Sequence, residues 1–270
     1  MSENVPVVIL AGGRGTRMRD FSARIPKAIV PIGNMAVIEH VMRIYSYYGF
    51  NDFVIALGYK GDSIKQYFQR EESEKEFSLQ IEDAVLHYSP LEKGRFNIDF
   101  VDTGLETESG GRIKKLENVI KSDTFFMTYC DGVSDVNIKD LLAFHKNKGK
   151  IATLTAVHAI NPFGVVMIED GIVSSFKEKP ALPGYINGGF FVFNRKIFDY
   201  LDKNSVLERE PLQELAKSGQ LAAYQHEGFW ASMDTHKDVD RLNKVWETGI
   251  FPDTGMNFGK APWKVWKDNL

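Results

Sequence analysis

The sequence predicts an α/β fold in which a parallel sheet is flanked by helices. Apolar runs that are typical of buried strands alternate with helical hydrophobic patterns from the N-terminus onward. The first four elements follow the order strand, helix, strand, helix, which favours parallel strands joined by helices. Of the 270 residues, 43% are hydrophobic, which is enough for one large α/β domain or two small ones. Because no repeat or low-complexity linker divides the chain, we expect one domain over residues 1–270.

The elements are expected in the following order. Residues 7–10 are consecutive apolar residues and predict a buried strand, and residues 37–48 predict the first helix. The second strand and helix are expected at residues 53–57 and 61–70. Residues 71–93 are polar, charged and poorly periodic, which predicts an excursion from the fold or a subunit contact. Further strands are expected at residues 96–102, 125–129, 151–157, 164–168 and 188–193, and further helices at residues 138–148, 211–218 and 237–247.

The C-terminal segment, residues 249–270, is expected to form a loop followed by a tail that contains tryptophan. Residues 251–258 include Gly, Pro and Asn, which favours a loop. Trp263 and Trp266 follow this loop. Two such aromatic side chains either pack onto the domain surface, which we favour, or form an oligomer contact.

Composition excludes several classes of protein. The chain has 33 basic and 36 acidic residues and a net charge of −3, so no overall basic field would hold nucleic acid or an anionic membrane. The single cysteine, Cys130, excludes an intramolecular disulfide and a cysteine-cluster metal site. The first residues lack the pattern of a signal peptide, and no apolar run approaches the roughly 18 residues of a membrane span. We therefore expect a cytoplasmic protein.

A glycine-rich segment directly after the first strand predicts a phosphate-binding loop. Glycines there allow backbone N–H groups to approach a phosphate without obstruction by Cβ, and Arg17 and Lys27 add the positive charge that a triphosphate requires. The segment is neither a Walker sequence nor a dinucleotide fingerprint, since its glycine spacing differs from both, which argues against a dinucleotide-dependent oxidoreductase. A surface turn is the alternative interpretation of the glycines. The predicted nucleotide-binding loop consists of Leu10, Ala11, Gly12, Gly13, Arg14, Gly15, Thr16 and Arg17.

This segment resembles the signature of the sugar-1-phosphate nucleotidyltransferase family. In that family a strand is followed by Leu-Ala-Gly-Gly-x-Gly-Thr-Arg and then by a lysine between two prolines. The match is specific from residue 10 to residue 17 and weaker afterwards, where Lys27 is present but Ala28 replaces the second proline. The resemblance implies a Rossmann-like nucleotidyltransferase fold with a mixed, mostly parallel central sheet flanked by helices.

Two aspartates follow apolar segments and are candidate metal ligands. Asp131 stands at the end of the strand expected at residues 125–129, and in open α/β sheets ligands bind at that end of the strands. Taken alone, Asp131 before Gly132 is also typical of a turn, and Asp234 is also suited to cap the following helix. Mg²⁺ takes one or two carboxylates together with phosphate oxygens and water. The family resemblance implies that Asp131 and Asp234 bind Mg²⁺.

Motifs in the middle of the chain resemble the glucose-1-phosphate cytidylyltransferase branch of the same family. They occur in order at residues 101–104, 107–112, 129–133, 186–191, 228–235 and 260–264, and so cover nearly the whole chain. Two adjacent glycines allow close approach to a planar base, although a turn before a helix is the alternative, and an arginine offers a fixed donor fork for base or phosphate oxygens. The residues that this resemblance assigns to nucleotide binding are Thr107, Gly110, Gly111, Arg112 and Cys130.

The acceptor pocket is expected at two later motifs. Residues 176–180 form a mixed charge run, and such runs are commonly solvated. In the family, however, the Glu-Lys-Pro motif and the Asn-Gly-Gly segment after it line the sugar-phosphate pocket. By this resemblance Lys179 would meet the phosphate, while Glu178 and Asn187 would meet sugar hydroxyls.

Together these observations predict a Mg²⁺-dependent cytidylyltransferase that uses CTP and a sugar phosphate, with glucose 1-phosphate as the implied acceptor. Arg17 would meet the leaving pyrophosphate, and Lys27 would stabilise charge at the transferring phosphoryl group. The alternatives are another triphosphate such as UTP or dTTP, a different phosphorylated acceptor, or a catalytically silent nucleotide-sensing subunit. The six histidines show no metal-ligand spacing, and Cys130 has no evident catalytic histidine partner. The resemblance also implies a homo-oligomer, such as a hexamer.

Overall fold

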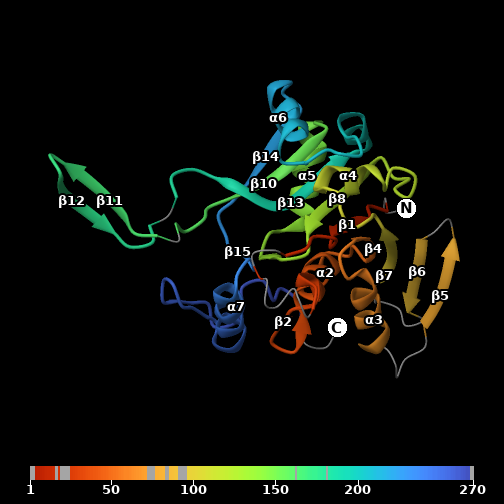
Figure 1. Ribbon diagram of the computed structural model, residues 1–270, viewed down its shortest axis with the longest axis horizontal. Coiled ribbons are helices and arrows are strands. Elements are labelled where there is room, and N and C mark those ends of the chain that lie inside the picture. The colour runs from red at the N-terminus through yellow and green to blue at the C-terminus, as the bar shows by residue number, and fades with distance from the viewer. Residues whose placement is uncertain are drawn as a thin grey trace.

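The computed structural model describes residues 4–15, 18, 25–71, 77–82, 85–90, 96–161, 163–180 and 182–267. In this part of the chain, nine strands form one sheet with the order β14-β10-β13-β8-β1-β4-β7-β6-β5 (Figure 1). All of these strands run in one direction except β13 and β6. The predicted α/β fold with a mixed, mostly parallel sheet is therefore confirmed. The strands are β1 (Val7–Leu10), β4 (Asp52–Leu57), β5 (Phe77–Glu82), β6 (Val85–Pro90), β7 (Asn97–Asp102), β8 (Thr124–Tyr129), β10 (Ala152–Val157), β13 (Ile186–Asn194) and β14 (Leu221–His226).

The central strands are buried on both faces, which explains why they appear in the sequence as continuous apolar runs. In β1, Val7 and Ile9 pack into one hydrophobic cluster, while Val8 and Leu10 pack into a second cluster on the opposite face. Successive side chains of a strand point to opposite faces, so a run of four apolar residues fills two cores at once. The same alternation continues along the neighbouring strands of the sheet.

Helices cover both faces of this sheet. One cluster includes residues of α2 (Val37–Tyr47), α3 (Gly61–Glu71), α5 (Ile138–Lys148) and α7 (His236–Thr248). The other cluster includes residues of α4 (Ser109–Lys114), the short helix η3 (Arg195–Tyr200) and α6 (Glu210–Lys217). In Figure 1, α2 and α3 lie below the central strands, and α4 and α6 lie above them. Each expected helix is present with bounds that differ by at most one or two residues, and α4 was not anticipated.

The parallel strands end side by side, and this positions the loops that follow them. Leu10 at the end of β1 is paired with Ala56 of β4 on one side and with Tyr129 of β8 on the other. Leu57 of β4 is in turn paired with Asp102 of β7. The loops after these four strands therefore emerge at one edge of the sheet, where ligands bind in folds of this type.

The excursion expected over residues 71–93 is wrong for the residues that the structure describes. There β5 and β6 form an antiparallel pair, and β6 pairs with β7, so that both strands extend the main sheet. Antiparallel strands at the edge of a sheet do not require the continuous apolar run of a central strand. Their polar sequence consequently carried little signal for a strand.

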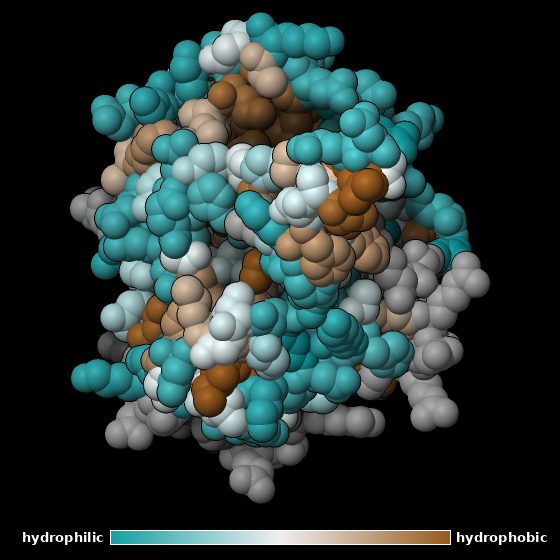
Figure 2. Space-filling view, turned by 90° about the vertical axis from the view of Figure 1, so that its left-hand side faces the viewer, coloured by the Kyte–Doolittle hydropathy of each residue, from teal (hydrophilic) through white to brown (hydrophobic). Residues whose placement is uncertain are grey.

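A second hairpin, formed by β11 (Val165–Glu169) and β12 (Ile172–Lys177), projects away from the body of the molecule (Figure 1). The sequence predicted its first strand but not its second. This hairpin exposes many large apolar side chains, and Figure 2, which faces that side of the molecule, shows hydrophobic residues exposed among hydrophilic ones. The exposed apolar residues of the hairpin are Val165, Val166, Met167, Ile168, Ile172, Val173 and Phe176.

The C-terminal tail packs into the core. Trp263 is fully buried, and its ring stacks on Phe229 with centroids 5.4 Å apart. Its Nε1 donates a hydrogen bond of 3.2 Å to Nδ1 of His40. Trp266 is also buried, so the packing interpretation of the two tryptophans is confirmed.

The loop expected at residues 251–258 contains a small hairpin of β16 (Ile250–Phe251) and β17 (Met256–Asn257). Its turn includes Gly255, which has a φ of 70°. Such a two-residue pairing is too short to leave a strand pattern in the sequence. In the described residues, no helix is both long and apolar enough to cross a membrane.

Candidate active site

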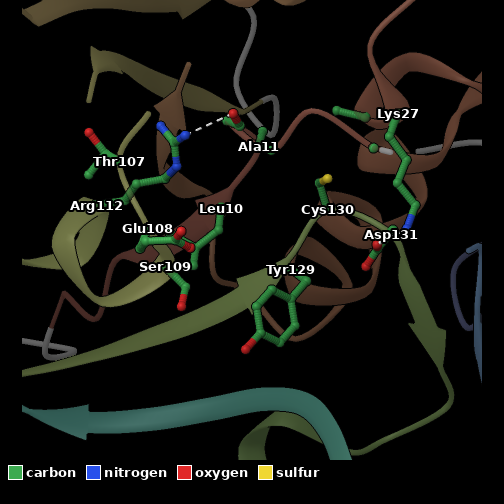
Figure 3. Close-up of a pocket in the computed structure, with 14 residues that line it drawn as sticks. Leu10, Ala11, Lys27, Thr107, Glu108, Ser109, Arg112, Tyr129, Cys130 and Asp131 are labelled. Atoms are coloured by element: carbon green, nitrogen blue, oxygen red, sulfur yellow. Dashed lines mark hydrogen bonds and ion pairs between the residues drawn. The ribbon is translucent and has the colours of Figure 1, made fainter. Parts of the chain in front are cut away.

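Two cavities open at the edge of the sheet where the parallel strands end. The first cavity, of about 300 Å³, lies between the loop after β1, the start of α4 and the end of β8 (Figure 3). The second cavity, of about 460 Å³, lies between the end of β8, the start of β13 and β15 (Trp230–Ser232). Tyr129 and Asp131 line both cavities, so the two spaces share a wall. The predicted nucleotide-binding residues that line the first cavity are Leu10, Ala11, Gly12, Gly13, Gly15, Thr107, Arg112 and Cys130.

Lys27 lines the first cavity and pairs with both predicted metal ligands, of which Asp131 belongs to the wall shared by the two cavities. It begins the short helix η2 (Lys27–Ile29), and its ammonium group reaches toward Asp131 (Figure 3). Lys27 Nζ forms an ion pair with Oδ2 of Asp131 and lies 3.0 Å from Oδ1 of Asp234. Burial lowers the pKa of Lys27, but the two carboxylates outweigh burial and raise the pKa above its ordinary value. Lys27 is therefore a permanent positive charge between two carboxylates.

Strand pairing brings these two aspartates together from distant parts of the sequence. Asp131 directly precedes β9 (Gly132–Ser134), which pairs with β15, and Asp234 follows β15. The N–H of Met233 donates to the carbonyl of Asp131 at 3.0 Å, which continues this pairing. The residues that follow β8 and the residues that follow β15 therefore lie side by side in the site.

Asp234 does not cap helix α7, which was the alternative to a role as metal ligand. Thr235 is the N-cap residue, and it forms a capping box with Asp238. The carboxylate of Asp238 accepts hydrogen bonds from the N–H groups of Asp234 and Thr235 at 3.0 and 2.8 Å. Asp238 and Thr235 thus form the cap of α7, and the Asp234 side chain pairs with Lys27.

The donor set at this point suits a hard cation that also binds phosphate. In the described residues, no group of three or more His, Cys, Asp or Glu side chains is arranged to hold a metal ion. A site built only from protein ligands, as for structural zinc, is therefore not found in this part of the chain. Two carboxylates that already surround a positive charge match Mg²⁺, which completes its coordination with phosphate oxygens and water.

The glycine-rich loop after β1 has two positions that favour glycine. A Cβ on Gly12 would overlap the guanidinium group of Arg112, whereas a Cβ on Gly13 would meet nothing within 4 Å. Gly15 has a φ of 59°, in the left-handed region that favours glycine. Arg14 forms an ion pair with Glu106 rather than lining the cavity. Thr16 and Arg17 lie outside the described residues.

Arg112 lies on α4, and its guanidinium group donates hydrogen bonds to carbonyl and hydroxyl groups of the protein itself. Its Nη2 donates to the carbonyl of Gly12 at 2.9 Å, and its Nη1 donates to the carbonyl of Gly104 and to Oγ1 of Thr103, both at 2.7 Å. Burial lowers the pKa of Arg112, and the charges of nearby carboxylates oppose this effect. Arg112 thus ties the loop after β1 to the loop after β7. In this arrangement it is a positioning residue, and its expected contact with base or phosphate oxygens stays a prediction.

Gly110 and Gly111 are not among the residues that line the first cavity, and their expected contact with a base stays a prediction. Both are buried in α4, where a Cβ on Gly110 would lie 2.8 Å from the carbonyl oxygen of Ser205. A Cβ on Gly111 would overlap the carbonyl of Lys203. These glycines therefore allow close approach of the chain's own 203–205 segment to α4. They belong to the helix itself and not to a turn before it.

Cys130 and Tyr129 form part of the floor of the first cavity. Cys130 is buried, and burial together with the charge of Asp131 raises the pKa of its thiol to about 12. A thiolate nucleophile is therefore disfavoured at neutral pH, as the sequence suggested. The Tyr129 hydroxyl donates a hydrogen bond to Glu208, and burial raises the pKa of Tyr129.

The structure brings only one of the three predicted acceptor residues to this site. Asn187 lines the second cavity, and its Oδ1 accepts a hydrogen bond of 2.9 Å from the N–H of Gly189. Glu178 and Lys179 line neither cavity, and Lys179 Nζ lies 2.9 Å from Oδ1 of Asp253 in the β16–β17 hairpin. The hydrogen bond and charge of Asp253 raise the pKa of Lys179. Binding of the acceptor by Glu178 and Lys179 stays a prediction.

The second cavity also contains residues that the sequence did not single out. Glu208, Trp230 and Ser232 line it together with Asn187 and Asp234. Trp230 Nε1 donates a hydrogen bond of 2.7 Å to the carbonyl of Gly188, which fixes the indole ring in the wall. Trp230 belongs to a matched motif, so that resemblance could have indicated it, but no pattern in the sequence marks Glu208.

Comparisons with known proteins agree with this geometry. A family model described as nucleotidyl transferase matches residues 6–251 of the chain. Glucose-1-phosphate cytidylyltransferase of Salmonella typhi is 42% identical over 266 residues, which cover 96% of this chain and 99% of that enzyme. Mannose-1-phosphate guanyltransferase of Gibberella zeae is 30% identical over 241 residues, which cover 86% of this chain and 61% of that protein.

Solved structures share the same architecture. HddC from Yersinia pseudotuberculosis, complexed with GMP-PN, matches with a TM-score of 0.66 and 21% sequence identity. The match covers 89% of this chain and 98% of that chain. At this level of identity the likeness supports the fold alone.

Proposed function

Because the chain belongs to the nucleotidyl transferase family, we propose that it forms CDP-glucose and pyrophosphate from CTP and glucose 1-phosphate. Nucleotidyl transfer as the type of reaction follows from the family itself. The substrate pair is supported by the Salmonella relative, which is 42% identical along nearly the full length of both chains. The observation that carries the proposal is the position of Lys27, between Asp131 and Asp234, where two cavities meet.

Two adjoining cavities suit a reaction of two substrates. The first cavity, with the glycine loop on one side, would take CTP, and the second cavity would take the sugar phosphate. An oxygen of the acceptor phosphate attacks the α-phosphorus of CTP and forms the new P–O bond. The bond between the α-phosphorus and the bridging oxygen of the β-phosphate breaks, and pyrophosphate leaves with that oxygen.

The attacking group does not require a general base. A phosphate monoester is largely dianionic near neutral pH, since its second pKa is about 6. Catalysis is then a matter of positioning the two substrates and of compensating charge at the transferring phosphoryl group. Lys27, which lies between Asp131 and Asp234, would compensate charge at the transferring phosphoryl group. Arg17 is proposed to meet the leaving pyrophosphate.

A divalent metal ion is used by enzymes of this family, and we propose Mg²⁺ for this chain. Asp131 and Asp234 would hold it, since two carboxylates at a phosphate site match the ligands that Mg²⁺ prefers. When bound, the ion supplies positive charge to the phosphate oxygens. Lys27 would then give up part of its pairing with the carboxylates and turn its charge toward the phosphates.

We further propose that the protein works in the cytoplasm as a homo-oligomer. The exposed apolar side chains of the β11–β12 hairpin support the homo-oligomer, because isolated two-stranded hairpins are only marginally stable and exposed apolar patches mark contact surfaces. Light scattering coupled to gel filtration would give the mass in solution. A monomer at micromolar concentration would contradict the oligomer but leave the proposed reaction untouched.

A panel of substrates tests the proposed reaction. CTP, UTP, dTTP and GTP are each combined with the 1-phosphates of glucose, galactose and mannose, and pyrophosphate release is measured with Mg²⁺ present. We expect the highest kcat/KM for CTP with glucose 1-phosphate. A higher value for another pair would reassign the substrates. Binding of nucleotide without turnover of any pair would favour the silent sensing subunit.

A further inference from the structure

Glu208 occupies a wall of the second cavity and has no role in the proposed transfer of the phosphoryl group. It lies just before α6, in a segment that no motif of the sequence marked. It lines the second cavity, which also contains Asn187, Asp131 and Asp234. It does not line the first cavity, although its partners Tyr129 and Ser109 do.

Both oxygens of the Glu208 carboxylate are held by hydroxyl groups. The Tyr129 hydroxyl donates to Oε1, and the Ser109 hydroxyl donates to Oε2 at 2.7 Å. Oγ of Ser109 in turn accepts a hydrogen bond of 2.9 Å from the N–H of Leu207. The carboxylate is therefore fixed in direction by one residue from the end of β8 and one from the start of α4.

The segment that carries Glu208 is itself anchored. Leu207 is fully buried in the core, next to Glu208 in the chain. The N–H of Gly111 donates to the carbonyl of Ser205 at 3.0 Å, and the absence of a Cβ at Gly110 and Gly111 lets the segment lie against α4. Recognition by hydrogen bonds requires such preorganised groups, because a mobile carboxylate would lose the gain to entropy.

The chemistry of the cavity favours hydroxyl groups as the partners of Glu208. An ionised carboxylate has about four acceptor positions, of which Tyr129 and Ser109 use two, so both oxygens can accept one further hydrogen bond. A phosphate would be repelled by this carboxylate and is attracted instead to Lys27. The rings of Tyr129 and Trp230 supply apolar surface on which a sugar ring can rest.

We propose that Glu208 is a specificity-determining residue for the acceptor, whose carboxylate accepts hydrogen bonds from hydroxyl groups of the sugar. This inference rests on the proposed function, since it requires that the second cavity hold the sugar phosphate. It adds Glu208, which lines the second cavity, to the residues expected to meet sugar hydroxyls, while the expected contact of Glu178, which lines neither cavity, stays a prediction. A sugar without the hydroxyl group would leave the fixed carboxylate unpaired, and this is how such sites reject a wrong sugar.

The test combines a variant with substrates that lack single hydroxyl groups. Glu208→Gln keeps the shape of the side chain but replaces one acceptor oxygen with a donor. Glu210→Gln, which changes an exposed acid two residues further on, is the matched control. KM and kcat are measured for CTP, glucose 1-phosphate and its 2-, 3-, 4- and 6-deoxy analogues. Circular dichroism and thermal unfolding establish that each variant is folded.

We expect Glu208→Gln to lower kcat/KM for glucose 1-phosphate by about 10- to 100-fold, the usual effect of one or two hydrogen bonds to a charged group. KM for CTP should change by less than about twofold, and the loss should vanish for the deoxy analogue that lacks the hydroxyl read by Glu208. A loss that is equal for CTP and for every analogue would overturn the proposal and leave Glu208 as a structural support. No loss at all would also overturn it.

These outcomes separate the proposal from the function on which it rests. If the wild-type protein forms CDP-glucose while Glu208→Gln behaves as Glu210→Gln does, only the role of Glu208 fails. If the wild-type protein releases no pyrophosphate with CTP and any sugar 1-phosphate, the proposed function fails before a variant is compared.

Discussion

Replacement of Lys27 by methionine removes the ammonium group from between Asp131 and Asp234 while keeping the length of the side chain. Lys27 Nζ lies 3.0 Å from Oδ1 of Asp234 and also pairs with Asp131. Two opposite effects are expected. Binding of a divalent metal ion without nucleotide should tighten, because the cation that competes for the carboxylates is gone. Turnover should slow, because charge at the transferring phosphoryl group is no longer compensated.

The geometry gives the scale of both effects. A unit-charge pair at 3.0 Å interacts by about 5 to 6 kcal/mol at an effective dielectric constant of about 20. Burial of the ammonium group offsets part of this gain, since burial acts to lower the pKa of Lys27. Loss of one preorganised group that stabilises transition-state charge costs about 3 to 4 kcal/mol, so kcat should fall by about 10²- to 10³-fold. Metal affinity should rise by about tenfold or more, which corresponds to about 1.4 kcal/mol.

The two effects are measured separately. Binding of Mn²⁺ to the protein without nucleotide is followed by the electron paramagnetic resonance signal of the free ion, and turnover is followed by pyrophosphate release. Lys65→Met, which removes a lysine from α3 that pairs with Asp62, serves as control. Weaker Mn²⁺ binding in Lys27→Met, or a kcat that equals that of the control, would refute the reasoning.

Substitutions of Asp234, Arg112 and His40 should each have a different effect. Asp234→Asn removes one of the two proposed anionic ligands of Mg²⁺. Activity in the presence of Mg²⁺ should therefore fall by orders of magnitude while the melting temperature stays near that of the wild type, and equal activity would exclude Asp234 as a ligand. Arg112→Lys should lower the free energy of unfolding by about 2 to 4 kcal/mol, because buried carbonyls such as that of Gly12 lose their donors, and urea titration measures it. For His40, burial lowers the pKa to about 4. Because the unfolded state binds the proton first, the His40 contribution to stability should fall as the pH drops from about 6.5 to about 4, by up to roughly 3 kcal/mol. His40→Gln should remove this part of the slope and leave the part due to His145, whose pKa burial also lowers to about 4.

The sequence predicted the fold where strands are buried on both faces. The continuous apolar runs of β1, β4 and β8 cannot be read as anything but core segments once helices alternate with them. The same logic placed Asp131 at the carboxyl end of β8, where the site is found. The strands β5 and β6, which end the sheet as antiparallel strands, and the exposed hairpin β11–β12 lack a continuous apolar run of this kind, and they were missed wholly or in part.

The details of the site could not be predicted because they depend on contacts between distant residues. The hydrogen bonds of Arg112 could not be predicted, because the carbonyl groups that it binds come from loops that meet only in the folded chain. Two adjacent glycines at 110 and 111 indicated that another group lies close to the backbone there. The sequence could not indicate that this group is the 203–205 segment of the same chain. Glu208 precedes a proline-containing helix start, where an acid is common, so its sequence context gave no sign of Tyr129 as its partner.

The central claim is that the junction at Lys27, Asp131 and Asp234 transfers a cytidylyl group to a sugar phosphate. Chromatography with mass detection of a reaction of the protein with CTP, glucose 1-phosphate and Mg²⁺ tests this claim most directly. We predict equal amounts of CDP-glucose and pyrophosphate with the wild-type protein, and neither product with the double variant Asp131→Asn, Asp234→Asn. Failure of the wild-type protein to form CDP-glucose, or its formation at the same rate by the double variant, would contradict the claim.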